Sequence, residues 1–449
     1  MSNLTTVTKG NINAKYYTPN DCTLGRAQTL FTKEPITIKW IEQMSPGDVL
    51  YDVGANVGMY SVYAGYHGVK VYAFEPMYEN YAILVKNLFL NDTGGVAYCL
   101  AMSDKMSLDQ LYLSSHKPGG SLNSFGQKIG PFLEPRDTKG HGAVSMSIDD
   151  VVRLGLPHPN HIKIDVDGLE HLVIAGAHLT LLSLPLKTVL IEINPNLPEH
   201  QGILKLFSDA GWYLDKRQVE NSTRKDGPFK GYAEHLFHKL SPLGLHTVEK
   251  IKNAEVINDP FPHIYVEDVF HPSIYQAILS NLPPDDGYKT ISEMRPVKGY
   301  ADRYVTYTTS SFWKDMERFM LSGVIREAFE KKFNLKSGGD EVLLIRDKAG
   351  YSIGPHTDSP HKAMSALFYL PVNGENESAG TSMYAPKEAG FTCDGTKHHD
   401  PSLFNLVKTM KYRPNSLFAF PKSDKSFHGV ETYQGKSNRD VYLYDIKSC

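Results

Sequence analysis

The sequence predicts two domains of different classes: an α/β domain with a parallel sheet, followed by a β-sandwich or β-barrel domain with a helical buttress. The chain has 449 residues, enough for two or three domains. Short β-rich runs alternate with helix-length segments in its first half, which is typical of a parallel sheet covered by helices on both faces. Beyond about residue 240, helical stretches precede short alternating apolar runs, which favours a β domain.

Five strands are expected in the first half, and helical segments follow several of them. The strands are expected at 49–53, 70–76, 96–103, 161–168 and 188–195. Segment 234–268 contains prolines and polar breaks, so we interpret it as a connector. The expected organisation is a first domain over 1–245, a linker over 246–260 and a second domain over 261–449.

In the second half we expect two helical stretches and then four apolar strands. The helices are expected at 272–282 and 313–333, and the strands at 341–347, 364–372, 415–421 and 439–446. Helices that precede a set of strands would buttress the resulting β-sandwich or barrel.

The composition is that of an ordinary globular protein and excludes several classes. The formal net charge is -3, which gives no reason to expect a nucleic acid or an anionic membrane as partner. The 4 cysteines are scattered, so neither a disulfide framework nor a zinc ribbon is expected. The polar N-terminus does not resemble a signal peptide, and no apolar stretch is long enough to span a bilayer. We therefore expect a cytoplasmic protein; the sequence does not indicate its oligomeric state.

The first candidate site begins at a glycine-rich turn, Asp52-Val-Gly-Ala-Asn-Val-Gly58, between a strand and a helix. Gly54 and Gly58 allow a tight turn and the close approach of a ligand to the backbone. Glu75 ends the next strand, where a carboxylate can accept both hydroxyls of a ribose. Because ligands bind at the carboxyl ends of parallel strands, Asn56 and Glu75 are expected at one edge of the sheet.

Three interpretations of this turn differ in the ligand. A dinucleotide site lacks the third glycine of the GxGxxG pattern, and a purely structural glycine turn does not account for Glu75. A nucleoside cofactor without a pyrophosphate fits the pattern better, which favours S-adenosylmethionine.

Six motifs in order resemble the FkbM-type methyltransferases, which are class I enzymes with a Rossmann-like α/β fold that mostly O-methylate saccharides and natural products. They are YDVGANVG, AFEP, AMSDK, SIDD, IKIDVDGLEHLVIAG and VLIEINP, within residues 15–215. The resemblance implies these cofactor contacts: Asp52, Gly54, Asn56 and Gly58 on the methionine and ribose side, Glu75 at the ribose, and Ser103 with Asp104 beside the adenine.

Asp165 is the candidate catalytic residue of this domain. It ends a predicted strand, so it is expected at the cofactor edge, where it would orient an acceptor hydroxyl or act as general base. The alternative is a carboxylate that caps the following helix, and we favour capping for Asp167 and Glu170. The sequence does not decide whether this domain needs a divalent metal.

The second candidate site is the stretch Tyr351-Ser-Ile-Gly-Pro-His-Thr-Asp358. A His-x-Asp pair together with a distant histidine is the ligand set of a 2-His-1-carboxylate Fe(II) site. His356 and Asp358 supply the pair, and His428 is our preferred distal ligand because it follows an apolar strand. His398 and His399 are the alternatives, and we interpret them as loop residues.

Arg439 lies 11 residues after His428, inside the next predicted strand. A buried arginine can bind a carboxylate through two parallel hydrogen bonds. His356, Asp358, His428 and Arg439 are therefore what an oxygenase that uses Fe(II), 2-oxoglutarate and O₂ requires.

This half resembles the prolyl-hydroxylase-like branch of the Fe(II)/2-oxoglutarate oxygenases, over residues 260–449. The motifs YSIGPHTD, ALFYLP, GTSMY and RPNSLFAFP occur in family order. The resemblance implies a double-stranded β-helix (jelly-roll) core, and it implies that Tyr369 shares the distal carboxylate of 2-oxoglutarate with Arg439. Thr381 follows Gly380 where the family has a second glycine, and the long interval before His428 suggests a substrate lid over 373–411.

The sequence therefore predicts a bifunctional enzyme that transfers a methyl group from S-adenosylmethionine and hydroxylates with Fe(II) and 2-oxoglutarate. The two reactions are expected to serve one pathway, in sequence on one small-molecule or saccharide acceptor. The alternatives are a peptide or protein hydroxylase of the prolyl type with a methyltransferase, a methyltransferase with a non-catalytic β binding domain, and a scaffold whose two sites are relics.

Overall fold

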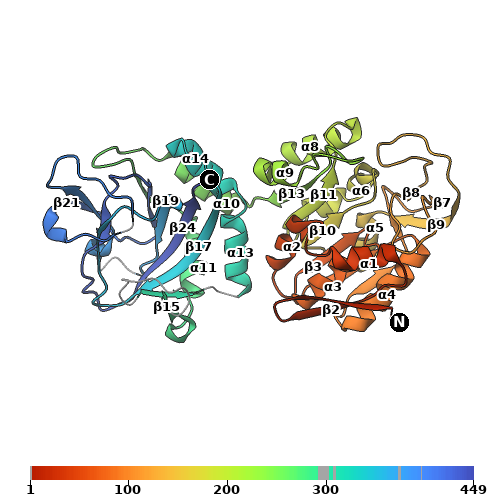
Figure 1. Cartoon of the computed structure of the whole chain (residues 1–449), viewed down its shortest axis with the longest axis horizontal. Helices are drawn as coiled ribbons and strands as arrows, with labels where there is room; N and C mark the ends of the chain where they lie inside the picture. Colours follow the sequence, from red (N-terminus) through yellow and green to blue (C-terminus); the bar gives the residue numbers. More distant parts are fainter. Residues whose placement is uncertain (1–2, 292–302, 307–309, 373–375, 396) are drawn as a thin grey trace. The chain divides into compact units, whose positions relative to one another are not determined.

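The computed structural model describes residues 3–291, 303–306, 310–372, 376–395 and 397–449. The chain divides into two compact units, Met1–Leu240 and Ser241–Cys449 (Figure 1). The division precedes the segment that the sequence predicts to be a linker. Most of that segment is helix α10 (Pro242–Asn253), which begins after the N-cap Ser241 and packs against α14 (Val324–Phe333) in the second unit.

The first unit is built on a seven-stranded sheet. Its strands in spatial order are β12 (Trp212–Leu214), β13 (Ala233–Lys239), β11 (Thr188–Ile193), β10 (His161–Ile164), β3 (Val49–Val53), β4 (Lys70–Phe74) and β5 (Val96–Tyr98). The five strands from β11 to β5 are parallel, whereas β13 pairs antiparallel with both β11 and β12. The predicted parallel sheet is therefore confirmed.

Two apolar cores cover the two faces of this sheet, because successive side chains of a strand point to opposite faces. Leu50 joins one core, with residues of α2, α3 and α4, whereas Tyr51 joins the other, with residues of α5 to α8. The helices are α2 (Pro35–Glu42), α3 (Met59–Tyr66), α4 (Tyr78–Asn91), α5 (Ile148–Arg153), α6 (Glu170–Ala175), α7 (His178–Leu182) and α8 (Pro198–Asp209). The prediction of helices on both faces is confirmed (Figure 1).

Two expectations for the first unit were wrong in detail. Strand β13 lies within the predicted connector, because six of its seven residues are buried although it carries a glutamate and two histidines. The single strand expected at 96–103 is instead two strands in different sheets, β5 and β6 (Ala101–Met102).

Two further parts of the first unit have no counterpart in the predicted strands and helices. One is an N-terminal hairpin of β1 (Leu4–Lys9) and β2 (Ile12–Tyr17), followed by helix α1 (Asp21–Gln28), whose N-cap Asn20 forms a capping box with Thr23. The other is a four-stranded sheet of β6, β9 (Gly140–Met146), β7 (Ser107–Tyr112) and β8 (Ser124–Phe125). Helix α9 (Lys216–Ser222) precedes β13.

The described residues of the second unit form two antiparallel sheets. The larger has the order β14 (Ile264–Glu267), β22 (Ser416–Pro421), β19 (Lys362–Tyr369), β24 (Arg439–Lys447), β17 (Gly339–Asp347), β16 (Arg303–Thr306) and β15 (Lys289–Thr290). The smaller has the order β18 (Ile353–His356), β23 (His428–Val430), β20 (Ser382–Pro386) and β21 (Phe404–Thr409). Leu367, Phe418 and Val441 of the larger sheet share one apolar core with Met383 of the smaller.

Helices α11 (Pro272–Ser280), α13 (Ser311–Met320) and α14 supply the predicted buttress. Phe270, which precedes α11, stacks on Phe368 of the larger sheet, Trp313 of α13 packs edge-on against Tyr442, and Phe329 of α14 stacks on Tyr444. The helix expected over 313–333 is two helices, because Gly323 adopts a left-handed φ of 94° between them.

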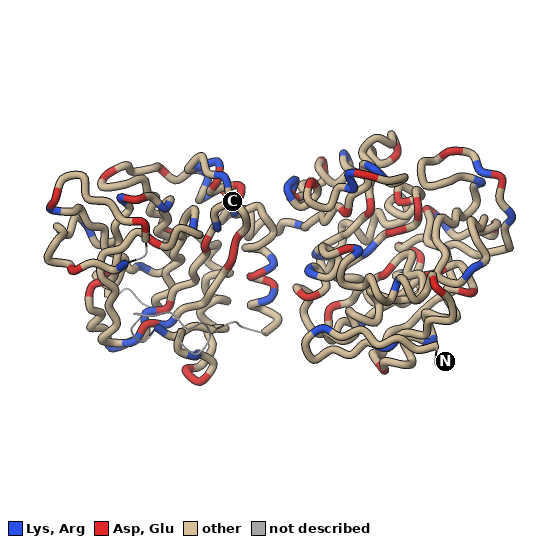
Figure 2. Tube along the Cα trace, in the orientation of Figure 1, with Lys and Arg blue, Asp and Glu red and all other residues tan. Residues whose placement is uncertain are grey.

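Charged residues of both signs are interspersed along both units (Figure 2). Among the described residues, no helix has the length and apolar character needed to cross a bilayer.

Candidate functional site

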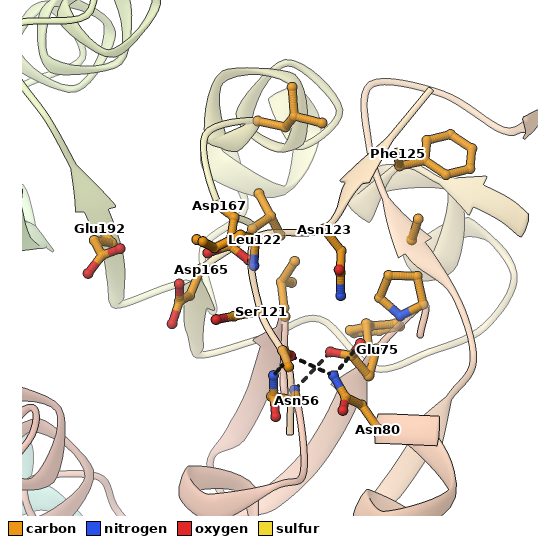
Figure 3. A pocket seen from close by; sticks show the side chains of 18 of the residues that line it. Asn56, Glu75, Asn80, Ser121, Leu122, Asn123, Phe125, Asp165, Asp167 and Glu192 are labelled. Carbon is orange, nitrogen blue, oxygen red and sulfur yellow. Dashed lines mark hydrogen bonds between the residues drawn. The ribbon is translucent and has the colours of Figure 1, made fainter. Parts of the chain in front are cut away.

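A cavity of about 530 Å³ opens in the first unit at the carboxyl ends of β3, β4 and β10. Four residues predicted for the cofactor and for catalysis line it: Gly54, Asn56, Glu75 and Asp165. Figure 3 shows Asn56, Glu75 and Asn80 joined by hydrogen bonds, whereas Asp165, Asp167 and Glu192 lie on another side of the cavity. The expectation that these motifs meet at one edge of the sheet agrees with this arrangement.

The glycine turn brings the chain very close to the neighbouring strand. Gly54 has φ +82°, and a Cβ atom built there would lie 1.9 Å from the backbone oxygen of Asp165. Gly58 also has a positive φ, and a Cβ there would lie 2.4 Å from the Leu84 side chain. Both glycines are therefore required by the backbone and by packing.

Gly54→Ala is expected to lower the free energy of unfolding of the first unit by roughly 3 kcal/mol or more, because a left-handed φ costs about 1–2 kcal/mol and the Cβ also collides with backbone. Gly47→Ala is the matched control: Gly47 has φ +89° but open space around its Cβ position. The free energy of unfolding of both variants is measured by urea titration, with hydrogen exchange in peptides of the first unit as the signal. Equal losses of unfolding free energy in the two variants would show that the collision of the Cβ atom does not contribute.

Glu75 is held in place by the turn that it faces. Its Oε2 accepts a hydrogen bond from the Asn56 backbone N–H at 2.9 Å, and its Oε1 accepts one from the Met77 backbone N–H at 3.0 Å. The Asn80 amide is 3.4 Å from Oε1. Burial raises the pKa of Glu75 to about 7, although these hydrogen bonds oppose the rise.

The loop between β7 and β8 closes over one side of the cavity. The carbonyl of Gly120 accepts hydrogen bonds from the Asn56 and Asn80 side chains at 2.7 and 3.0 Å, and the Gly119 N–H donates to Asn80 Oδ1 at 2.7 Å. The Leu122 N–H donates to Asp167 Oδ2 at 2.6 Å. Asn80 was not predicted from the sequence, because its only signal is its position in the first turn of the helix after AFEP.

Asp165 forms an ion pair inside the cavity. Lys163 Nζ lies 2.9 Å from Asp165 Oδ2 and 4.0 Å from Glu34 Oε2. Burial alone would raise the pKa of Asp165, but the Lys163 ammonium outweighs it and holds the pKa well below its usual range. Asp165 is therefore an ionised hydrogen-bond acceptor at neutral pH.

The other two carboxylates of this motif differ in their surroundings. Asp167 lines the cavity, and burial together with the charge of Asp165 raises its pKa to about 7. Glu170 is the first residue of α6, and it accepts hydrogen bonds from the Val166 and Gly168 N–H groups and lies 3.0 Å from His200 Nε2. These N–H groups precede the helix, so Glu170 does not cap it. Asp167 is not a cap either, because its carboxylate binds the loop at Leu122.

Four residues of the predicted cofactor set do not line the cavity: Asp52, Gly58, Ser103 and Asp104. Asp52 is buried, and its Oδ2 accepts a hydrogen bond from the Ser61 hydroxyl at 2.5 Å. The cavity wall beside Ser103 is instead formed by Leu100, Ala101 and Met102. The AMSDK segment therefore contributes apolar residues to the cavity, and not the polar contact that was expected from Ser103 and Asp104.

The second unit brings together the predicted metal ligands. His356 ends β18, His428 begins β23, and the two residues pair across the smaller sheet. With Asp358 they are buried and offer three ligand atoms that all lie within 4.8 Å of one another. Among the described residues this is the one such group, and it matches the ligand set of a 2-His-1-carboxylate site.

Backbone carbonyls orient both imidazoles. His356 Nδ1 lies 2.9 Å from the Gly354 oxygen and His428 Nδ1 lies 2.9 Å from the Ser426 oxygen. Because a carbonyl only accepts, each Nδ1 must carry the proton, which leaves each Nε2 lone pair for a metal. Burial lowers the pKa of His356 to about 3, so its imidazole is neutral at physiological pH.

Asp358 is oriented by a cation and a hydroxyl. Lys362 Nζ lies 3.2 Å from its Oδ1, and the Ser365 hydroxyl donates to its Oδ2 at 3.0 Å. Lys362 is itself paired with Asp445 at 2.8 Å. The sequence does not single out this network, because Asp445 is distant along the chain and meets Lys362 only across strands.

The alternative histidines lie in a loop that packs against the metal-ligand strand. The His398 ring is 4.7 Å from the His356 ring, and the His399 N–H donates to the Pro355 carbonyl at 2.9 Å. Of the lid predicted over 373–411, β20 and β21 belong to the smaller sheet, whereas residues 373–375 and 396 lie outside the described residues.

Arg439 is fully buried and pairs with a residue that the sequence analysis missed. Its Nη1 donates to Asp347 Oδ2 at 2.6 Å and its Nε to the Ala379 carbonyl at 2.5 Å. Arg303 binds the same carboxylate through two hydrogen bonds, at 2.9 and 3.0 Å. The Arg439 Nη2 is buried and, among the described residues, has no hydrogen-bond partner.

Tyr369 lies beside this arginine but bonds to another residue. Its hydroxyl donates to Thr381 Oγ1 and accepts from the Thr381 N–H, both at 2.9 Å. The Arg439 guanidinium lies 5.8 Å from the Tyr369 ring centre. Thr381, which departs from the family's second glycine, therefore holds the tyrosine hydroxyl.

Two solved structures are similar to parts of this chain, with low TM-scores. A prolyl-4-hydroxylase from Pseudomonas putida matches 46% of this chain and 100% of its own, with 12% identity and a TM-score of 0.32. The methyltransferase FkbM from Methylobacillus flagellatus KT matches 49% of this chain and 55% of its own, with 14% identity and a TM-score of 0.30. These scores are too low to support an inference.

Curated relatives match part of the chain. The 31-O-demethyl-FK506 methyltransferase FkbM of Streptomyces tacrolimicus is 28% identical over an alignment of 158 residues, and the match covers 30% of this chain and 61% of that protein. The hexuronic acid methyltransferase AglP of Haloferax volcanii is 27% identical over 172 residues, 38% of this chain and 65% of that protein. The chain thus spans less than two thirds of the length of either relative.

A family model matches a range that includes most of the residues that line the cavity. Residues 52–212 match the family described as "Methyltransferase FkbM domain". The matched range begins at the glycine turn and includes the loop over the cavity, Asp165 and strand β11. The comparisons therefore support an FkbM methyltransferase domain over residues 52–212 of the first unit.

Proposed function

We propose that the chain is a bifunctional enzyme. Its first unit would transfer a methyl group from S-adenosylmethionine to a hydroxyl, and its second unit would hydroxylate a C–H bond with Fe(II), 2-oxoglutarate and O₂. The observation that carries the proposal is that each unit gathers a separate and complete set of reactive side chains: the cavity around Glu75 and Asp165, and the triad of His356, Asp358 and His428.

The cavity fits S-adenosylmethionine, which supplies an electrophilic methyl group on its sulfonium. In this proposal the ionised Glu75 accepts hydrogen bonds from the two ribose hydroxyls, using the lone pairs that its backbone donors leave free. Because the glycines of the turn have no Cβ atom, the ligand can approach the backbone closely. Met102 and Phe125 line the cavity and offer an apolar contact for the adenine, which Ser103 and Asp104 do not.

The pKa of Glu75 gives this binding a pH dependence. Below pH 7 the free carboxyl becomes protonated and loses acceptor capacity, so the affinity for S-adenosylhomocysteine, the reaction product, should fall up to about tenfold from pH 7 to pH 6. The folded pKa lies above the ordinary 4.5, so stability without ligand decreases as pH rises from 4.5 to about 7.

Calorimetric titration with S-adenosylhomocysteine at several pH values measures this dependence. Glu75→Gln should bind more weakly and lose the pH dependence, whereas Asp167→Asn should keep it. An unchanged pH profile in Glu75→Gln would assign the titration to another group.

Asp165 is proposed to position the acceptor hydroxyl. As an ionised carboxylate it accepts the hydroxyl hydrogen bond and so aims the oxygen at the methyl group, and it takes the proton as the new bond forms. Lys163 keeps Asp165 charged and fixes its direction. Because its pKa is held low, we expect orientation to be its larger contribution.

The acceptor is proposed to be a hydroxylated small molecule, such as a saccharide or natural product. The names of the relatives support this class, since they refer to FK506 and to a hexuronic acid. Charged side chains of both signs line the cavity and can form hydrogen bonds with several hydroxyls of one ligand: Lys33, Asp167, Glu192 and Arg224.

In the second unit the strand order supports a double-stranded β-helix. Of the eight strands from β17 to β24, β17, β19, β22 and β24 belong to the larger sheet, and β18, β20, β21 and β23 to the smaller. The chain therefore passes back and forth between two sheets that share one core, as in a jelly roll.

The triad fits Fe(II), which with 2-oxoglutarate and O₂ supplies the oxidising power to hydroxylate an unactivated C–H bond. Two neutral imidazoles and one carboxylate are the ligands that such a site requires. Arg439 is proposed to bind the distal carboxylate of 2-oxoglutarate through its unpartnered Nη2. Arg303, Asp347 and Arg439 together carry one net positive charge, which that carboxylate would neutralise.

Two assays test the proposal without knowledge of the acceptor. The first is calorimetric titration of the full chain with S-adenosylhomocysteine. The second is anaerobic titration with Fe(II) and 2-oxoglutarate, followed by the charge-transfer absorption of the complex, with succinate release measured after O₂ is admitted. A second unit that binds neither iron nor 2-oxoglutarate would be a non-catalytic binding domain.

A further inference from the structure

Part of the methyltransferase cavity is built by residues outside the range that matches the family. That range begins at residue 52, yet helix α1 and the turn after it contribute residues to the lining. Those residues are Cys22, Gly25, Arg26, Thr29 and Lys33. The N-terminal segment can therefore contact a ligand through residues that lie outside the family motifs.

Arg26 differs from the other two cations that line the cavity within the described residues. Lys33 Nζ is paired with Glu34 at 2.8 Å, and the Arg224 guanidinium is paired with Glu192. The Arg26 Nε–H donates a hydrogen bond to the Gly119 carbonyl at 2.6 Å. Among the described residues, its two terminal amino groups have no hydrogen-bond partner. This bond fixes the plane of the guanidinium and leaves two parallel donors for a ligand.

The surroundings of Arg26 favour a ligand with both charges. Burial raises the pKa of the Glu75 and Asp167 carboxyls and Lys163 lowers that of Asp165; the positive charge of Arg26 makes a smaller, lowering contribution at all three, so it acts electrostatically on both sides of the cavity. An arginine beside these carboxylates matches a zwitterion whose carboxylate binds the guanidinium and whose ammonium faces the acids. The amino-acid end of S-adenosylmethionine is such a zwitterion.

We propose that Arg26 binds the α-carboxylate of S-adenosylmethionine through its two terminal amino groups. The assignment rests on the proposed methyl-transfer function. It means that the N-terminal segment completes the cofactor site, with Arg26 holding the amino-acid end and Glu75 the ribose. The same side chain joins the ligand to the loop at Gly119, so the loop and the cofactor share one support.

The test compares three ligands on the full chain by calorimetry: S-adenosylhomocysteine, its decarboxylated analogue, and 5′-methylthioadenosine, which lacks the amino-acid end. Arg26→Leu should weaken binding of S-adenosylhomocysteine by roughly 10- to 100-fold, the range expected for losing a charge-assisted hydrogen-bonded pair. The two ligands without a carboxylate should bind Arg26→Leu within about twofold of the unmodified chain.

Two further variants complete the design. Arg26→Lys keeps the charge but not the parallel donors, so it should recover part of the affinity for S-adenosylhomocysteine. Arg153→Leu removes a cation that does not line the cavity and should change nothing. Retained binding of 5′-methylthioadenosine shows that each variant is folded.

The outcomes separate this assignment from the proposed function. An equal loss for all three ligands would show that Arg26 only supports the loop at Gly119, and no loss for any would show that it makes no contact; either result overturns the assignment. Failure of the unmodified chain to bind S-adenosylhomocysteine would instead overturn the methyl-transfer function, and the assignment with it.

Discussion

His356→Ala is expected to abolish 2-oxoglutarate turnover by the full chain, because it removes one of three ligand atoms that meet within 4.8 Å. The affinity for Fe(II) should fall by at least about 100-fold, the upper end of what is lost when residues that merely orient metal ligands are changed. Metal content after dialysis and succinate release measure the two effects.

His398→Ala is the control for this variant, since its ring lies 4.7 Å from that of His356 but His398 is not part of the ligand set. It should keep most of the Fe(II) affinity, whereas His428→Ala should lose it. The opposite ranking of these two variants would make His398 the distal ligand.

The His356→Ala variant also tests the proposed order of the two reactions. If hydroxylation creates the oxygen that is then methylated, His356→Ala should yield neither the hydroxylated nor the methylated product from the native acceptor. Comparing metabolites of cells with the active and inactive gene would identify that acceptor through mass shifts of one oxygen and one CH₂. Normal methylation by His356→Ala would show that the order is wrong.

Asp165→Asn is expected to reduce methyl transfer by roughly 100-fold or more, because an amide neither takes a proton nor aligns the acceptor hydroxyl as a carboxylate does. The amide keeps the shape of the side chain, and the affinity for S-adenosylhomocysteine should stay within about threefold because Asp165 is assigned to the acceptor. Rates with an identified acceptor and calorimetry measure the two quantities.

Asp209→Asn provides the comparison, since Asp209 is an exposed carboxylate that pairs with Lys205 on the surface. It should methylate at the normal rate. An Asp165→Asn chain with a normal rate and normal affinity would move the catalytic role to another carboxylate in the cavity, with Glu192 as the first to test.

Features that repeat locally along the chain were predictable from the sequence. The parallel sheet follows from the alternation of apolar runs and helical segments, and the meeting of Gly54, Asn56, Glu75 and Asp165 follows from the rule that parallel strands end at one edge. The approach of His356 to His428 was predictable only from the ordered motifs, since 72 residues separate them.

Features that depend on pairing across the fold were not predictable. Asp347 and Arg439 are 92 residues apart, and the side-chain bond between them follows from the pairing of β17 with β24. Strand β13 was missed because its polar residues mark a connector in sequence but are buried in the sheet. Similarly, Ser103 looks like a ligand contact in its motif, yet Met102 faces the cavity.

The central claim is that one chain holds two independent sites. The most direct test is to measure, on the unmodified chain and on Glu75→Ala and His356→Ala, the binding of S-adenosylhomocysteine and of Fe(II) with 2-oxoglutarate. We expect the unmodified chain to bind both. Glu75→Ala should lose only the binding of S-adenosylhomocysteine, and His356→Ala should lose only the binding of Fe(II) with 2-oxoglutarate. A chain that binds only one of them, or loses both in either variant, would contradict the central claim.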